Sequence, residues 1–72
     1  MNLLTDEVSV GDSFIKVGDY SRRVYVVHSL TDAHGFFQHA RLVANAGSDR
    51  ILIATSALLD SNYWSRVSAK ED

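Results

Sequence analysis

The chain contains no cysteine, so neither a disulfide nor a cysteine-ligated metal can hold its fold together. Long apolar runs are also absent, and none approaches the length of a membrane span. Residues 1–7 lack a basic segment followed by an apolar one, so we expect no signal peptide. These absences predict a cytoplasmic protein without a membrane-bound part, whose 72 residues form one domain.

The chain also lacks an excess of positive charge, because seven Lys and Arg residues stand against nine Asp and Glu residues, which gives a net charge of −2. This balance argues against a nucleic-acid-binding protein that relies on diffuse electrostatic attraction. Four of the acids lie near the chain ends, so residues 8–69 carry six basic and five acidic residues. Five of these six basic residues are arginine, which favours planar, bidentate contacts over diffuse attraction.

What the sequence does contain is short runs of alternating apolar and polar residues, with almost no helical periodicity. The runs are Ser13–Val17, Arg23–Leu30, Gln38–Ala44, Arg50–Thr55 and Tyr63–Val67. Turns that contain glycine separate the first four, which is typical of antiparallel strands joined by hairpins. Before the last run, Ser56 precedes Ala57-Leu58-Leu59 and predicts one helical turn with Ser56 as its N-cap.

The pattern therefore predicts an all-β fold, a small five-stranded antiparallel SH3-like barrel with one short helical turn before the last strand. We expect this domain to span residues 8–67, with flexible tails at 1–7 and 68–72. So short a barrel leaves little room for an internal cavity, and we expect any function to lie on its surface.

The alternation also predicts which side chains face the core. The expected inward residues are Ile15, Val17, Val24, Val26, His28, Leu30, Ala40, Leu42, Ala44, Ile51 and Ile53. The expected outward residues include Phe14, Arg23, Tyr25, Val27, His39, Arg41, Val43, Arg50 and Leu52. Their shared phase in three successive runs makes Val26, Leu42, Ile51 and Ile53 the predicted centre of the core.

Four segments, Gly11–Phe14, His39–Val43, Ser56–Asp60 and Tyr63–Val67, resemble those of a group of short uncharacterised bacterial proteins with an SH3-like small β-barrel. The resemblance covers nearly the whole chain. It implies a bacterial protein of a single domain, and it implies no activity.

The polar residues do not form a recognisable catalytic or metal-binding motif. His28, His34 and His39, with Asp32, are the obvious metal ligands, but the expected strand phase places His28 and His39 on opposite faces. Serine, histidine and aspartate are all present, yet no nucleophile elbow or oxyanion-hole loop accompanies them. We therefore predict no metal, no cofactor and no enzymatic activity.

The remaining candidates for function are aromatic and arginine side chains. The predicted binding residues are Arg23, Tyr25, Phe36, Phe37, Arg41 and Trp64, with Tyr63 and Arg66 in the same set. Such residues on a small barrel can form a shallow groove for an extended peptide or a single-stranded nucleic acid. Tyr25 and Arg41 are expected to be exposed neighbours on adjacent strands. The alternative for Phe37 and Trp64 is that they complete a thin core, and the sequence leaves this open for Trp64.

From these observations the sequence favours a non-catalytic binding or adaptor module with a protein or peptide partner. A barrel that binds single-stranded nucleic acid is the alternative. The chain is expected to be a monomer, or a weak homodimer formed through an edge strand.

Overall fold

The computed structural model describes residues 7–33 and 37–67, and all statements below concern these residues. Within them the chain forms five strands, β1 (Ser13–Lys16), β2 (Val24–Ala33), β3 (Phe37–Ala44), β4 (Asp49–Ala54) and β5 (Trp64–Val67). A 3₁₀ turn, η1 (Asn45–Gly47), joins β3 to β4, and one helical turn, α1 (Thr55–Leu58), follows β4. No helix in this part of the chain is long and apolar enough to cross a membrane.

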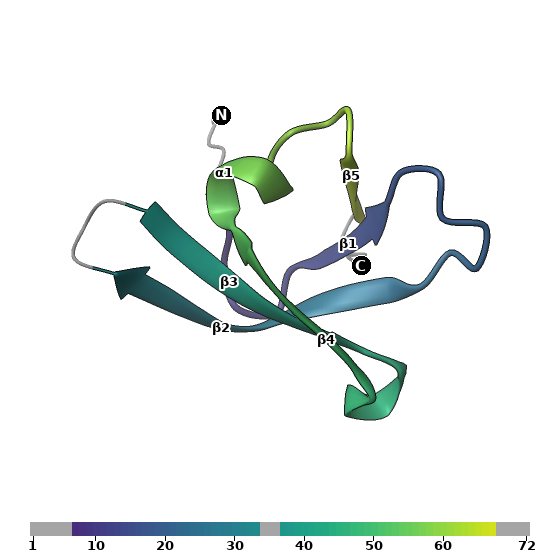
Figure 1. Cartoon of the computed structure of the whole chain (residues 1–72), viewed down its shortest axis with the longest axis horizontal. Helices are drawn as coiled ribbons and strands as arrows, with labels where there is room; N and C mark the ends of the chain where they lie inside the picture. Colours follow the sequence, from purple (N-terminus) through teal and green to yellow (C-terminus); the bar gives the residue numbers. More distant parts are fainter. Residues whose placement is uncertain (1–6, 34–36, 68–72) are drawn as a thin grey trace, which may run out of the picture.

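The strands form one antiparallel sheet in the order β4-β3-β2-β1-β5. The chain passes through the first four strands as successive hairpins, and the last strand returns to pair with the first. Figure 1 shows that the sheet curls, with α1 lying between the β3–β4 side and β5. The predicted all-β antiparallel fold with a helical turn before the last strand is confirmed.

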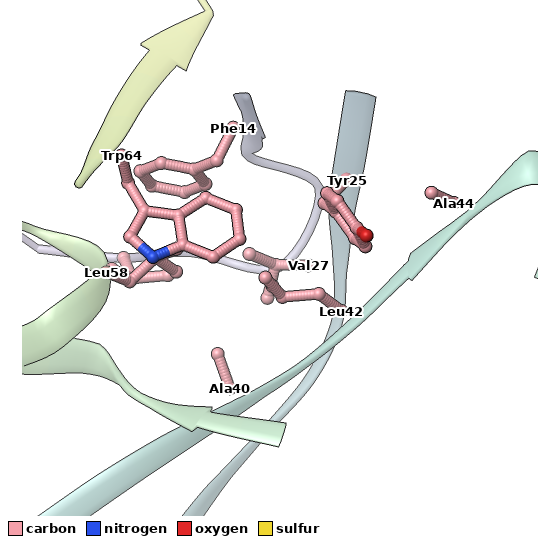
Figure 2. Packing of buried hydrophobic residues seen from close by; sticks show 9 residues of the cluster. Phe14, Tyr25, Val27, Ala40, Leu42, Ala44, Leu58 and Trp64 are labelled. Atoms are coloured by element: carbon pink, nitrogen blue, oxygen red, sulfur yellow. The ribbon is translucent and has the colours of Figure 1, made fainter. Parts of the chain in front are cut away.

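The curled sheet encloses a small core on its inner face. Its buried members are Val8, Phe14, Tyr25, Val27, Ala40, Leu42, Ala44, Leu58 and Trp64. Figure 2 shows Phe14, Leu58 and Trp64 pointing toward one another from different elements. No polar or charged residue among the described ones is buried, so the core is held by apolar packing.

The predicted faces of β3 and β4 are confirmed. Ala40, Leu42 and Ala44 are buried, and Ile51 and Ile53 pack against them from β4. The residues between them, such as Arg41 and Leu52, point away from the core and are exposed. β3 therefore keeps an apolar face inward from Ala40 to Ala44, and β4 does so at Ile51 and Ile53.

The predicted faces of β1 and of the first half of β2 are wrong. Phe14 is 1% exposed and Val27 is buried beside it, whereas Val26, predicted as core, is 37% exposed. Val17, also predicted as core, is likewise exposed. Because Phe14 pairs with Tyr25 in the register, both side chains enter the core together.

A β-bulge explains this error. The register of β2 against β3 shifts between Val27 and Ser29, so the inward phase changes from odd to even residues at His28. Leu30, after the bulge, packs against the core as predicted. Counting the alternation back from Leu30 without the bulge places Val26 on the wrong face.

The observed turns lie where the sequence predicts them, but the N-cap of α1 differs from the prediction. Gly11 and Gly18 adopt φ of 97° and 87°, values that residues with a side chain rarely adopt. In η1, Asn45 and Ala46 are also left-handed, with φ of 54° and 57°. The helical turn begins at Thr55 and has Ala54 at its N-cap without a side-chain hydrogen bond, so the predicted Ser56 cap is wrong.

We predict that Leu42→Ala lowers the free energy of unfolding by about 2–5 kcal/mol, because it leaves a cavity at a fully buried position. Leu52→Ala is the matched control on the neighbouring strand, since Leu52 is 59% exposed, and it should change stability by at most about 0.5 kcal/mol. Urea unfolding followed by circular dichroism measures both. Equal losses in the two variants would contradict the assignment of faces.

We also predict that Ala46→Gly stabilises the protein by up to about 1 kcal/mol, because glycine removes the penalty of a left-handed alanine. Ala57→Gly, the same change inside α1, should destabilise the protein by about 0.5–1 kcal/mol. Thermal melts of the two variants should therefore shift in opposite directions. A fall in the melting temperature of Ala46→Gly would show that its turn carries no such penalty.

Candidate functional site

Two of the predicted binding residues lie in the core. Tyr25 is 8% exposed and Trp64 is 7% exposed, and their rings meet edge to face with centroids 5.7 Å apart. Tyr25 thus lies on the face opposite to Arg41, and the predicted exposed pair of these two residues is wrong. The cause is again the bulge in β2, which turns Tyr25 inward.

Of the two adjacent phenylalanines, Phe36 lies outside the described residues. Phe37 begins β3, and only its backbone is described. His34 also lies outside the described residues. Among the residues that are described, no group of three or more histidine and acidic side chains is placed to hold a metal ion.

Arg23 holds two loops together. Its Nη1 donates to Asp49 Oδ2 at 3.1 Å, and its Nε and Nη2 donate to Ser21 Oγ at 3.2 and 3.1 Å. Asp49 begins β4, and it also accepts a hydrogen bond from Asn45 Nδ2 in η1. The guanidinium therefore links the loop between β1 and β2 to the turn between β3 and β4, and few of its donors remain for a partner.

The electrostatics of this cluster agree with its geometry. The pKa of Arg23 is raised, first by Tyr25 and then by the carboxylates of Asp19 and Asp49. The pKa of Asp19 is lowered, mainly because Ser21 Oγ donates a hydrogen bond to Asp19 Oδ1 at 2.7 Å. Both groups thus keep their charge in the folded protein.

Arg66, on the other edge strand β5, also makes contacts within the protein. Its guanidinium carbon lies 5.2 Å from the centre of the Phe14 ring, and its Nη2 donates to the Glu7 carbonyl at 2.7 Å. The same nitrogen lies 3.5 Å from Asp12 Oδ2. Arg66 therefore fixes the segment before β1 against β5, which is a structural contribution.

The outer face of the sheet carries several apolar side chains. In the register, Val26 stands between Ser13 and Val43, and Val43 stands beside Arg50. Val24, one pair further along, and Leu52, on the edge strand, are also exposed. Because these side chains belong to adjacent strands, they form a continuous patch rather than scattered apolar residues.

Two arginines border this patch on β3 and β4. Arg41 pairs with Leu52 and Arg50 pairs with Val43, so the two arginines stand diagonally across the strands. Arg50 Nε donates to the Gly47 carbonyl at 3.1 Å, which leaves its other N–H groups available. Among the described residues, Arg41 has no hydrogen-bond or ion-pair partner.

A shallow hollow of about 250 Å³ lies where these residues meet. It is lined by His28, Arg41, Val43, Gly47 and Arg50. No carboxylate from the described part of the chain lines the hollow, so its described lining is positively charged, and Val43 gives it an apolar contribution. An anionic group that enters it would find two arginines and an imidazole as donors.

Of the predicted site residues that are described, Arg41 is thus the one arginine that lies exposed without a hydrogen-bond or ion-pair partner. His28, Val43 and Arg50 were not among the predicted binding residues. The outward phase of Val43 and Arg50 was correctly assigned and was the available signal. His28 gave none, because the bulge that turns it outward has no mark in the sequence.

Comparison of the chain with protein-family models, with curated proteins and with solved structures gives no match. The site must therefore be interpreted from its own chemistry.

We predict that Ser21→Ala raises the pKa of Asp19 toward its ordinary value, because the alanine removes the main hydrogen bond that favours the carboxylate. In the parent protein the folded pKa of Asp19 lies below its unfolded value. This contribution to stability is present above the unfolded pKa and disappears as the pH falls through the folded pKa. Carbon-detected NMR titration of the carboxyl groups measures the shift, and an unchanged pKa would contradict the assigned cause.

Proposed function

We propose that this chain is a non-catalytic binding module with an SH3-like small barrel, and that it holds a protein partner on the outer face of its sheet. The observation that carries the proposal is the exposed apolar patch on β2–β4, bordered by Arg41 and Arg50. A patch that combines apolar area with unpaired arginines is typical of a surface that another protein covers.

The strand order supports the finer assignment of the fold. Four consecutive hairpin-connected strands, a helical turn before the fifth, and pairing of the fifth strand with the first are the arrangement expected for an SH3-like barrel. Folds of this kind serve many functions, so the fold by itself supports a small scaffold and not a partner.

Among the described side chains, no exposed aromatic ring lies on a strand of the sheet, which favours a protein over a single-stranded nucleic acid. Nucleic-acid-binding barrels stack bases on aromatic side chains. Among the described residues, Tyr25 and Trp64 are buried, while the exposed Tyr20 and Tyr63 lie outside the strands. The net charge of −2 also weakens attraction to a nucleic acid.

A quantitative pull-down from a lysate tests the proposal. We predict that Leu52→Asp, which places a charge in the apolar patch, abolishes capture of partners that the parent protein retains. Tyr20→Asp is the control, because Tyr20 is fully exposed in the loop between β1 and β2. Melting temperatures of both variants show whether they are folded.

The captured material is treated with nuclease before mass spectrometry. Loss of capture in Leu52→Asp alone supports the proposal. Equal capture by the parent and both variants would place the binding surface elsewhere. Capture that disappears after nuclease treatment of the parent would support the nucleic-acid alternative instead.

A further inference from the structure

The outer edge of β4 is open in the described part of the protein. β4 pairs with β3 on one side, and the order of the sheet places no strand on its other side. The backbone groups along such an edge can accept another extended segment, which then becomes an additional strand. The strand spans Asp49–Ala54, long enough for several main-chain hydrogen bonds.

The side chains beside this edge have a defined order on the outer face. Arg50 and Leu52 are two residues apart on β4, so both point outward. Arg41 on β3 pairs with Leu52 and stands diagonally to Arg50, and both arginines line the hollow together with Val43. A segment added to β4 would thus place one of its outward side chains beside Arg50 and another beside Leu52.

We propose that β4 receives an extended, acidic polypeptide segment, in which an aspartate or glutamate fills the hollow between Arg41 and Arg50 and an apolar residue two positions away packs on Leu52. This inference rests on the proposed function and names its partner class. The main-chain pairing supplies affinity, and the two side chains supply selectivity for an acidic residue, one spacer and an apolar residue.

The charges of the described residues favour this occupant over a second copy of the chain. Asp49, the single acidic residue of β4, is already bound to Arg23 and to Asn45. Pairing of two β4 strands would therefore bring arginines together without a free carboxylate to meet them. The other edge strand, β5, is shorter, and its arginine, Arg66, already contacts Phe14 and the Glu7 carbonyl.

Selection from a displayed library of random ten-residue peptides tests the proposal directly. The immobilised parent protein should enrich peptides with an acidic and an apolar residue two positions apart. Arg41→Gln and Arg50→Gln should each weaken binding of a selected synthetic peptide by about tenfold. Arg22→Gln is the matched control, because Arg22 is an exposed arginine in the loop between β1 and β2.

Backbone amide exchange measured by NMR reports where the peptide lies. Addition of the selected peptide should slow exchange along β4 and leave β5 unchanged. No enriched sequence, enrichment without acidic residues, or equal binding by Arg50→Gln and the parent would overturn the proposal. So would slowed exchange on β4 in the free protein that grows with its concentration, because that would show a second copy on this edge.

A fluorescent twenty-nucleotide oligo(dT) gives the remaining comparison. Binding of this probe that depends on Arg41 and Arg50, with no peptide binding, would assign the hollow to nucleic-acid phosphates and overturn the proposal. The experiments distinguish failure of the proposed binding function from failure of the proposed acidic partner. If Leu52→Asp loses its partner in the pull-down while peptide selection shows no acidic preference, the face is a binding surface but the acidic segment on β4 is wrong.

Discussion

The bulge between Val27 and Ser29 is the constraint on which the rest of the structure depends. Before it, β2 turns Tyr25 and Val27 into the core, where they meet Phe14 and Trp64. After it, the same strand turns Leu30 toward Ala40. A regular ten-residue strand would keep a single phase and would lose one of these two sets of contacts. The bulge therefore lets one strand line both ends of a curled sheet.

The same irregularity shapes the outer surface. Because Tyr25 and Val27 are turned inward, Val24 and Val26 are left on the outside, and His28 reaches the hollow beside Arg41. The core and the candidate binding surface are thus two consequences of one backbone feature. A change that removed the bulge would disturb both, so binding and stability are coupled at this position.

Much of the fold could be predicted from the sequence, because inward and outward residues alternate regularly from Ala40 to Ala44 in β3 and from Arg50 to Ile53 in β4. Their faces, the turn at Asn45–Gly47 and the helical turn before β5 follow from local pattern alone. The faces of β1 and β2 could not be assigned in this way. Phe14 and Ile15 are both apolar, and alternation cannot choose between them without the register of the neighbouring strand.

The candidate site was harder to predict than the fold, since it depends on which arginines are already bound. Arg23 and Arg41 look alike in the sequence, yet Arg23 contacts Asp49, which is far from it in the chain. Only the arrangement of the loops separates an arginine that stabilises the protein from one that remains available. Of the available pair, Arg41 and Arg50, only Arg41 was therefore predicted as a binding residue, although both were assigned to the outward face.

Arg50 affects both kinds of association that the open edge of β4 allows, pairing with a second copy and binding of another polypeptide. An uncovered edge invites association with other copies, and a charged residue on it opposes such pairing. The same charge attracts a segment that carries a carboxylate. Arg50 therefore disfavours pairing with a second copy and favours binding of an acidic segment. The apolar neighbours Val43 and Leu52 offer contact area equally to a second copy and to an acidic segment. The charge of Arg50 favours only the acidic segment. In the proposed complex, apolar contact contributes affinity, and Arg41 and Arg50 select the polypeptide by its charge.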